Sequence, residues 1–262
     1  RCMTILEQLA DHARERTENA KKTYPLEKLR EQALSLPQLN FAFEKAIRKK
    51  ELSFICECKK ASPSRGIIAH NFPYLQIAKE YEAAGADCIS VLTEPKWFLG
   101  NKEYLHQIAS TVSIPCLRKD FTVDEYMIYE SRILGASAVL LICSILSERQ
   151  IGEYIQICDA MGISALVEAH DEQEIAMAVH VGARLIGVNN RNLRDFTVDT
   201  ENSFRFREMI PRDILFVSES GIRNAQDVEK LRQVGADAVL IGETLMRAEN
   251  KAAKLTELRG VI

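Results

Sequence analysis

Four similar segments recur along this chain at intervals of about fifty residues, and this repeat restricts the possible folds more than any other feature. Each segment leads from the end of a helical stretch through Gly-Ala into an apolar run, at Gly85, Gly135, Gly182 and Gly235. Glycine after a helix adopts the left-handed conformation that turns the chain back into a strand. An interval of about fifty residues holds two strand–helix units, so the repeat predicts a regular alternation of strands and helices.

Short β-rich runs alternate with amphipathic stretches from residue 54 onward, which is the pattern of a parallel α/β fold. Eight runs are candidate strands: Phe54–Lys59, Cys88–Thr93, Ile114–Lys119, Ala138–Ser144, Ser164–Glu168, Leu185–Asn189, Leu215–Glu219 and Ala238–Gly242. Apolar residues at helical spacing predict helices at Tyr74–Ala84, Asp124–Leu134 and Asp171–Val181. The helix-capping signals are Thr122 with Glu125, Ser147 with Gln150, and Asp171 with Glu174.

The fold class that these units predict is α/β, as a closed (β/α)8 TIM barrel that occupies residues 54–262. An open doubly wound sheet is the alternative, but no GxGxxG motif follows the first strand. Residues 1–53 are predicted to form a helical extension over the barrel mouth, with a capping box at Thr4 and Glu7 and a second helix at Phe41–Lys50. Because no linker rich in Pro, Gly or Ser separates the two parts, residues 1–262 are expected to form a single domain.

Composition and charge exclude several classes of protein. The 262 residues include 34 basic and 37 acidic side chains, a net charge of −3, whereas nucleic-acid binding needs a surplus of Lys and Arg. The longest apolar run, Ala138–Cys143, is far shorter than the ~20 residues that span a bilayer. The first 22 residues are charged throughout and lack the apolar core of a secretory signal, so a soluble, cytoplasmic protein is expected.

Cysteine usage argues against both a disulfide framework and a metal site. The seven cysteines are at positions 2, 56, 58, 88, 116, 143 and 158. Their number is odd and they form no CxxC pair, whereas structural zinc sites usually use two such pairs. We therefore expect buried, reduced thiols and no metal ion.

Charged residues gather at the ends of the candidate strands, where a barrel places its active site. The period of two puts Glu57 and Lys59 on one face of the first strand, with Cys56 and Cys58 on the opposite face toward the helices. A charge inside a barrel is costly unless it is paired or functional, so these positions indicate catalysis rather than only structural ion pairs. The other polar strand-end residues are Lys119, Glu168, Asn189, Glu219 and Ser220.

Three loops at the same end of the barrel predict a phosphate site. Ser220-Gly221 follows the seventh strand and Gly242-Glu243 follows the eighth, where barrels often bind phosphate through backbone N–H groups. The loop after the first strand, residues 61–66, adds hydroxyl groups and the basic side chain of Arg65. The convergence of three such loops on one face favours a phosphorylated ligand.

Aromatic and histidine side chains are the remaining candidates. Trp97 and Phe98, in the loop after the second strand, form either an apolar wall for an aromatic group or an anchor for their own loop. The five histidines are scattered, and only His170 follows a strand end, where a loop position or a helix cap explains it equally well. Lysines beside carboxylates, a phosphate site and an apolar wall indicate general acid–base chemistry on a phosphorylated sugar with an apolar or aromatic group.

The strand-end motifs resemble, in order and spacing, those of the indole-3-glycerol-phosphate synthase family: ECKKASPSRG, SVLTEPKWFLG, LRKDF, LVEAH, IGVNNRNL, VSESGI and LIGETLM. The resemblance covers residues 54–247 and includes the helical extension that this family carries. Cys56 and Cys58 depart from the aliphatic residues that are common there, and Arg65 replaces the usual Lys. Both cysteines are expected to face away from the site.

The resemblance implies the step of tryptophan biosynthesis that closes the indole ring, without a metal or cofactor. The substrate would be 1-(2-carboxyphenylamino)-1-deoxyribulose 5-phosphate, and the products would be indole-3-glycerol phosphate, carbon dioxide and water. The resemblance further implies that Lys119 is the general acid at the sugar carbonyl and Glu168 the base in the dehydration. Lys59 would hold the substrate carboxylate or supply a second proton.

The same resemblance implies supporting roles for other strand-end residues. Glu57, Asn189, Glu219 and Ser220 would orient hydroxyl groups and tune the lysines. Substrate contacts are implied for Ser62, Gly221, Gly242 and Glu243 at the phosphate, Arg191 at an anionic group, and Phe98 and Phe121. The implied partner is a phosphorylated small molecule, with no nucleic acid and no membrane. The chain is expected to be a monomer or a small homo-oligomer, and association with other tryptophan-pathway enzymes stays open.

Two other functions stay open at this point. A Schiff-base lyase or aldolase acting on a sugar phosphate would also need a buried lysine at a strand end. A non-catalytic barrel that binds a phosphate ligand would keep the phosphate loops. It would not need two lysines and three glutamates at the strand ends.

Overall fold

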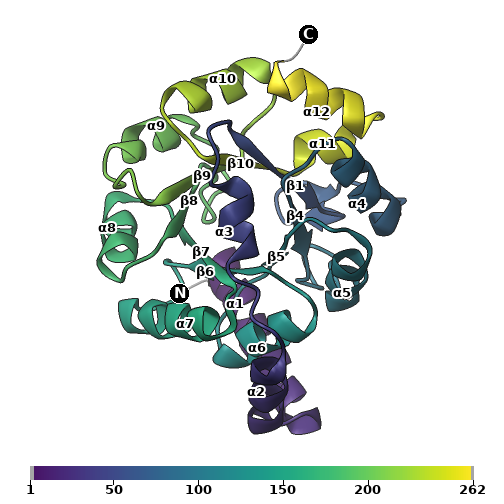
Figure 1. Ribbon diagram of the computed structural model, residues 1–262, viewed down its shortest axis with the longest axis vertical. Helices are drawn as coiled ribbons and strands as arrows, with labels where there is room; N and C mark the ends of the chain where they lie inside the picture. The colour runs from purple at the N-terminus through teal and green to yellow at the C-terminus, as the bar shows by residue number, and fades with distance from the viewer. Residues whose placement is uncertain (1–2, 261–262) are drawn as a thin grey trace.

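A computed structural model describes residues 3–260, and its centre is a closed barrel of eight parallel strands with helices around the outside (Figure 1). The strands follow one another around the barrel, and the last strand, β10, pairs with β1 to close it. The predicted TIM barrel is therefore confirmed, and the open sheet is excluded. The barrel strands are β1 (Ser53–Cys58), β4 (Cys88–Leu92), β5 (Cys116–Lys119), β6 (Ala138–Ile142), β7 (Ser164–Ala169), β8 (Leu185–Asn189), β9 (Leu215–Glu219) and β10 (Ala238–Ile241).

Helices cover the outer face of the barrel and connect successive strands, as a parallel sheet requires. No helix within residues 3–260 is long and apolar enough to cross a lipid bilayer. The outer helices are α4 (Tyr74–Ala83), α5 (Lys102–Thr111), α6 (Glu125–Ile133), α7 (Glu148–Met161), α8 (Glu172–His180), α9 (Glu201–Arg207), α10 (Ala225–Gln233), α11 (Glu243–Arg247) and α12 (Lys251–Arg259).

The helix starts agree with most of the predicted caps. Ser147 forms a capping box with Gln150, and the Asp171 side chain accepts a hydrogen bond from the N–H of Glu174. The predicted cap at Thr122 is wrong, because Asp124 accepts from the N–H of Tyr126 and α6 begins two residues later than that signal indicated. Asp124 stands directly before the first helical residue, so its side chain reaches the N–H group of Tyr126 more easily than the side chain of Thr122 would.

The four repeated glycines make the predicted left-handed turns. Gly85, Gly135, Gly182 and Gly235 have φ values of 86°, 94°, 80° and 79°. In each turn the glycine N–H donates to the carbonyl three residues back, and the following alanine N–H donates to the carbonyl five residues back. This paired bonding satisfies the last carbonyls of the helix and directs the chain into the next strand. The repeat seen in the sequence is thus the repeated end of a helix.

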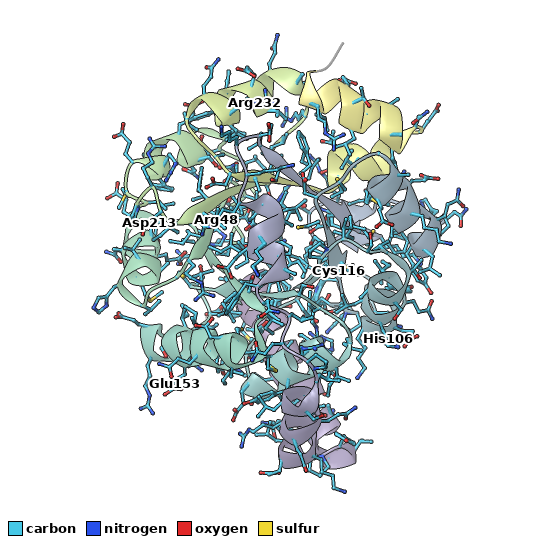
Figure 2. The ribbon with its side chains drawn as sticks, viewed as in Figure 1. Arg48, His106, Cys116, Glu153, Asp213 and Arg232 are labelled. Atoms are coloured by element: carbon cyan, nitrogen blue, oxygen red, sulfur yellow. The ribbon has the colours of Figure 1, made fainter. Side chains whose placement is uncertain are left out.

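Side chains alternate between the barrel interior and the helix layer, as the strand period requires. On β1, Ile55 packs in the interior cluster, whereas Cys56 and Cys58 pack against the outer helices as predicted. The six cysteines within residues 3–260 are free and buried, and Cys2 lies outside the described residues. Figure 2 shows Cys116 within the packed body of the molecule, and burial raises the pKa of its thiol to about 12.

The segment before β1 forms three helices that contact both ends of the barrel: α1 (Ile5–Thr23), α2 (Leu26–Ser35) and α3 (Ala42–Ile47). Helix α3 lies across the barrel centre in Figure 1, and its Glu44 accepts a 2.8 Å hydrogen bond from Ser164 at the start of β7. Helix α1 lies at the opposite, carboxyl end, where Arg16 binds Asp120 after β5. The capping box of Thr4 is present as predicted.

Two short elements had no counterpart in the predicted pattern. Helix α2 packs against α6 at the outer rim, and its N-terminus follows Pro25, which presets a helix start. Strands β2 (Ala61–Ser62) and β3 (Gly66–Ile67) form a small antiparallel hairpin in the loop after β1. This hairpin gives the first loop a defined backbone next to the cavity.

Two glycine-to-alanine substitutions test the role of the left-handed turns. A Cβ at Gly182 or at Gly152 meets no atom within 4 Å, but Gly182 has a φ of 80° whereas Gly152 lies inside α7. We expect Gly182→Ala to lower the free energy of unfolding by about 1–2 kcal/mol, and Gly152→Ala to raise it by about 0.5–1 kcal/mol. Urea denaturation measures both values, and equal effects at the two positions would contradict the turn interpretation.

Candidate active site

The carboxyl ends of the strands open into a cavity of about 300 Å³, and a smaller apolar cavity of about 50 Å³ adjoins it. Phe98, Lys119 and Asn189 line both cavities. Glu168 and Phe121 line the smaller cavity. The remaining residues predicted from the sequence line the larger cavity: Glu57, Lys59, Ser62, Arg191, Glu219, Ser220, Gly221, Gly242 and Glu243.

Lys119 is the central charge of this site. Its Nζ lies 3.8 Å from Glu57 Oε2 and 3.8 Å from Glu219 Oε2, and its side chain is 17% exposed. Burial alone lowers the pKa of Lys119, but the carboxylates of Glu57, Glu219 and Glu168 outweigh burial and raise it above its ordinary value. Lys119 therefore carries an ammonium group at neutral pH.

Lys59 has the opposite shift, although it lies in the same cluster. Its Nζ is 3.4 Å from Glu57 Oε1, but burial and the neighbouring Lys119 lower its pKa below that of an ordinary lysine. Burial raises the pKa of Glu57, yet the two ammonium groups and a 2.8 Å hydrogen bond from Ser90 bring it below its ordinary value. The two lysines thus differ in acidity because Lys119 has Glu219 and Glu168 beside it as well as Glu57, whereas Lys59 has Glu57 as its main carboxylate and lies near the cations Lys119 and Arg191.

Glu168 and Glu219 lie on β7 and β9, the strands on either side of β8, and both are close to Lys119. Burial and the charge of Glu168 raise the pKa of Glu219 well above its ordinary value, and Lys119 opposes that shift. Asn189 Nδ2 donates to Glu168 Oε1 over 3.2 Å, and Ser220 Oγ donates to Asn189 Oδ1 over 2.9 Å. A Cβ at Gly187 would overlap Glu219 Oε1, so this strand position needs glycine.

Basic side chains lie over the loops that were predicted to bind phosphate. The carboxylate of Glu243 is 3.2 Å from Arg65 Nε, 3.0 Å from Arg247 Nε and 4.0 Å from Arg191 Nη2. Three guanidinium groups around one carboxylate leave a positive charge at this side of the cavity. Gly221, with a φ of 80°, lets its loop turn tightly beside it.

His170 is a site residue whose role could not be predicted from the sequence, where a loop position or a helix cap explained it equally well. Its Nε2 lies 3.3 Å from Glu168 Oε1, whereas His106 lies exposed on the outer helix α5 (Figure 2). The available signal was the period of two, which places residues 168 and 170 on one face where β7 ends. Trp97 does not line either cavity and packs edge-on against His12 of α1.

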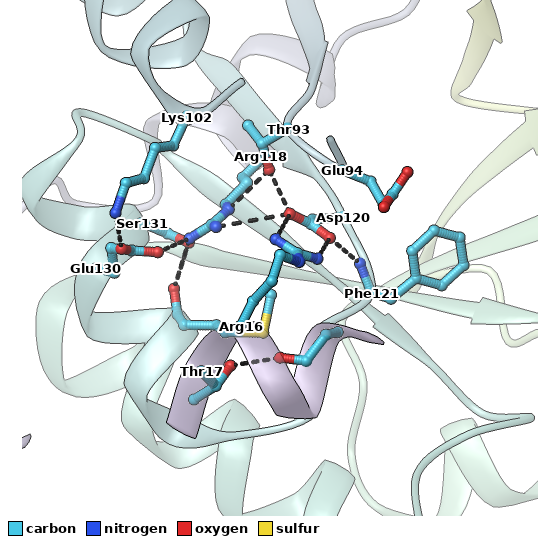
Figure 3. Close-up of polar contacts among 12 residues, drawn as sticks. Arg16, Thr17, Thr93, Glu94, Lys102, Arg118, Asp120, Phe121, Glu130 and Ser131 are labelled. Carbon is cyan, nitrogen blue, oxygen red and sulfur yellow. Dashed lines mark hydrogen bonds and ion pairs between the residues drawn. The ribbon is translucent and has the colours of Figure 1, made fainter. Parts of the chain in front are cut away.

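A buried polar network holds the residues on either side of Lys119 (Figure 3). Asp120 accepts hydrogen bonds from Arg16 Nη2 at 2.8 Å and from Thr93 Oγ1 at 2.6 Å. Its Oδ1 also accepts from the N–H of Phe121 at 2.7 Å. Burial raises the pKa of Asp120, but the neighbouring arginines outweigh burial and bring it below its ordinary value. The network therefore fixes the backbone that carries Lys119 and Phe121.

Arg118 extends this network on the outer face of β5. Its Nη1 donates to Glu130 Oε2 over 2.8 Å, and its Nη2 lies 3.6 Å from Asp120 Oδ2 (Figure 3). The side chain of Arg118 is 3% exposed, so both of its partners are needed to offset the cost of burial. Within residues 3–260, no group of three His, Cys, Asp or Glu side chains is placed to hold a metal ion.

The fold and the site define a TIM-barrel protein with paired lysines and carboxylates at its strand ends and basic side chains beside them. Three solved structures resemble this chain in fold alone. The match to a 3-hexulose-6-phosphate synthase covers 80% of this chain and 100% of that chain, with a TM-score of 0.65 and 15% sequence identity. A thiamine phosphate pyrophosphorylase from Pyrococcus furiosus covers 82% of this chain with a TM-score of 0.57 and 17% identity. The 3-hexulose-6-phosphate synthase from Salmonella typhimurium has a TM-score of 0.66 and 14% identity.

The family is defined by the sequence comparisons. The profile of the family described as "Indole-3-glycerol phosphate synthase" matches residues 6–258. An indole-3-glycerol phosphate synthase of Ruminiclostridium cellulolyticum is 56% identical over 98% of this chain and 99% of its own length. One from Endomicrobium trichonymphae is 49% identical over 97% of this chain and 99% of its own length.

The chain belongs to the indole-3-glycerol phosphate synthase family, and its activity is that carboxy-lyase step of tryptophan biosynthesis. The resemblance of the strand-end motifs is thereby confirmed. Family membership decides against the aldolase and the non-catalytic barrel that the residues alone left open. The family also implies a phosphorylated small molecule as substrate.

Arg16→Met tests the link between α1 and the active-site strand. Methionine keeps much of the length of arginine but removes its charge from the buried Asp120, so the free energy of unfolding should fall by about 1.5–3 kcal/mol at pH 7. Because Arg16 lowers the folded-state pKa of Asp120, this stabilisation is present above the unfolded pKa of about 3.9 and is lost as the pH falls through the folded value.

The control is Arg14→Met, which removes an exposed pair with Asp11 on the same helix and should change stability by less than about 0.5 kcal/mol. Urea denaturation at pH 7 and pH 3 gives both values. The same loss in both variants, or a loss for Arg16→Met that does not shrink at pH 3, would contradict the assigned role.

Proposed function

We propose that Lys119 and Glu168 carry the acid and base steps by which 1-(2-carboxyphenylamino)-1-deoxyribulose 5-phosphate becomes indole-3-glycerol phosphate, carbon dioxide and water. The observation that carries this proposal is the position of Lys119 at the junction of the two cavities. A substrate with a phosphate at one end and an aromatic ring at the other would place its sugar carbonyl at that junction. Asn189, which lines both cavities as well, lies there to orient the hydroxyl groups.

The phosphate end of the substrate fits the larger cavity. Ser62 and Gly221 line it from the loops after β1 and β9, and Gly242 and Glu243 line it after β10. We assign the phosphate to the hydroxyl group of Ser62 and to the backbone N–H groups of the other three residues. The excess of positive charge around Glu243 favours an anion at this position, and the guanidinium group of Arg191 is placed to bind that anion.

The aromatic end fits the smaller, apolar cavity. Phe98 and Phe121 line it with ring centroids 6.0 Å apart and planes tilted by 41°. Leu193 adds an aliphatic side chain to the same wall. An aromatic ring placed between these side chains gains the burial energy and edge contacts that aromatic clusters provide.

Ring closure begins when the ring carbon that bears the carboxylate attacks the sugar carbonyl carbon. A new C–C bond forms, and Lys119 gives its proton to the carbonyl oxygen, which becomes a hydroxyl group. The ring nitrogen is now an iminium, and the electron pair of the C–COO⁻ bond flows into it as carbon dioxide leaves. The two distances of 3.8 Å from Lys119 to its carboxylates exceed a hydrogen-bond length, which favours capture of the incoming oxygen by its N–H groups.

Dehydration then completes the aromatic indole ring system. The hydroxyl group leaves as water with a proton from Lys59, and Glu168 takes the proton from the neighbouring ring carbon as the double bond forms. Lys59 suits the donor role because its lowered pKa makes its ammonium the stronger acid of the two lysines. Two protons are given and one is taken, which balances the conversion of a carboxylate into neutral carbon dioxide.

The remaining polar residues tune these groups. Glu57 pairs with both lysines, and Glu219 lies 3.8 Å from Lys119 with a raised pKa. Ser220 fixes the amide of Asn189, which in turn donates to Glu168. These contacts set which groups are charged before substrate arrives, so little reorganisation is needed during the reaction.

The chain is further proposed to act as a single domain. The apolar faces of α1 and α3 share one cluster with the barrel interior, through Leu9, Phe43, Phe121 and Leu140. Ion pairs such as that of Arg16 with Asp120 reinforce the connection. A monomer or small homo-oligomer in the cytoplasm, independent of nucleic acid and membranes, stays the prediction for its state in the cell.

Lys119→Met should reduce kcat by about 10²–10⁴-fold, because the carbonyl oxygen loses its proton donor. Indole fluorescence after addition of the substrate measures turnover, and the dissociation constant for the substrate should change much less than kcat. Lys79→Met, at an exposed position on α4, is the matched control and should retain normal turnover. Wild-type turnover in Lys119→Met would overturn the general-acid assignment.

Lys59→Arg tests the second proton donor through its pH dependence. The lowered pKa of Lys59 means that its ammonium is lost below the ordinary lysine range, so kcat of the wild type should fall on the alkaline side as that proton is lost. Arginine keeps the positive charge but does not deprotonate in this range. We expect a lower kcat with the alkaline limb moved to higher pH, and an unchanged limb would refute this role.

A further inference from the structure

His170 lies immediately beyond the proposed base and has no part in the steps described above. Its Nε2 is 3.3 Å from Glu168 Oε1, and its backbone leads from the end of β7 into α8. The side chain is 16% exposed, so the ring is largely enclosed by protein. A buried imidazole in contact with a catalytic carboxylate influences both its charge and its orientation.

A second carboxylate binds the other nitrogen of the ring. Glu174 Oε2 is 3.3 Å from His170 Nδ1 and also accepts the backbone N–H of His170 at 2.7 Å. The other oxygen of Glu174 accepts a 2.5 Å hydrogen bond from Ser144 Oγ, in the loop after β6. Glu174 is therefore held from two directions, and it anchors the ring in front of Glu168.

Carboxylates near both nitrogens favour the doubly protonated ring: Nδ1 is hydrogen-bonded to Glu174, and Nε2 lies within ion-pair distance of Glu168 without a hydrogen bond to it. Only the imidazolium has an N–H group at each nitrogen, whereas a neutral ring would turn a lone pair toward one carboxylate. The charged groups around the ring are Glu168 from β7, and Asp171 and Glu174 at the start of α8. Burial lowers the pKa of His170, but Glu174 and Glu168 outweigh burial and raise it above its ordinary value.

The two oxygens of Glu168 have different surroundings. Oε1 is bound by the amide of Asn189 at 3.2 Å and contacted by His170 at 3.3 Å. Oε2 is buried and has no hydrogen-bond partner within residues 3–260. Oε1 is thus held by the Asn189 amide with His170 Nε2 beside it, and Oε2 is the oxygen left to accept a proton from a ligand in the adjoining cavity.

We propose that His170 is a positioning residue for the base: as an imidazolium anchored by Glu174, it orients Glu168 and stabilises its ionised form, so that Oε2 takes the substrate proton. The proposal rests on the proposed role of Glu168 as base.

His170→Phe removes both nitrogens and keeps a ring of similar size. We expect kcat at pH 7 to fall by about 10–100-fold, with the acid limb of the kcat profile moved up by about one pH unit or more. The KM should change less than twofold, because His170 does not line the phosphate cavity. His180→Phe, an exposed histidine at the end of α8, is the matched control and should leave the profile unchanged.

Three further measurements separate positioning from a merely structural role. Added imidazole should restore part of the activity of His170→Ala, since it supplies the missing cation. Glu174→Gln should move the acid limb in the same direction as His170→Phe, by a smaller amount, because the ring loses its anchor. In a Glu168→Gln background, His170→Phe should cause no further loss, whereas independent effects would multiply.

The outcomes distinguish this proposal from the one on which it rests. If Glu168→Gln keeps wild-type turnover, the base assignment itself fails. If Glu168→Gln is inactive while His170→Phe shows the wild-type pH profile, only the role of His170 is overturned. Thermal unfolding checks each variant, and where His170→Phe does not fold, His170→Gln replaces it: the same upward shift of its acid limb supports the proposal, and an unshifted limb refutes it.

Discussion

The interaction on which the rest of the site depends is the ammonium group of Lys119 among buried carboxylates. Its Nζ is 3.8 Å from both Glu57 and Glu219, inside a barrel whose interior toward the amino end is apolar. An isolated charge at this depth would be expelled or neutralised. The surrounding carboxylates keep the lysine charged, and the lysine in turn keeps Glu57 ionised, whereas burial and Glu168 raise the pKa of Glu219. Catalytic charge states are therefore set before any ligand binds.

The fold supplies this arrangement by simple alternation along its strands. Apolar residues such as Ile55 and Leu117 fill the interior toward the amino end, and Glu57 and Lys119 follow two residues later on the same face. The strand that carries Lys119 is held from outside the barrel by Arg118 and from helix α1 by Arg16 (Figure 3). The N-terminal helices thus support the active site as well as closing the barrel.

Most of the fold and the residues of the inner site could be predicted from patterns among residues that are close in the sequence. A glycine that ends a helix and a charge that ends a strand are recognised from the few residues around them. The strands and site positions such as Lys59 and Asn189 were therefore predictable. The contact of Arg16 with Asp120 joins residues 104 positions apart, and nothing local indicates it. His170 was visible as a strand-end residue, but its partner Glu174 faces it only after α8 has formed. The hairpin β2–β3 is too short to give a periodic pattern.

The central claim is that one barrel interior gives two neighbouring lysines opposite shifts in acidity. Nuclear magnetic resonance of protein labelled with ¹⁵N at the lysine Nζ atoms tests this directly, with Lys119→Met and Lys59→Met assigning the two signals. Lys119 should keep its ammonium at a pH above the ordinary lysine range, and Lys59 should lose its proton below that range. Titration of the two in the reverse order, or together at the ordinary lysine pKa, would contradict the account.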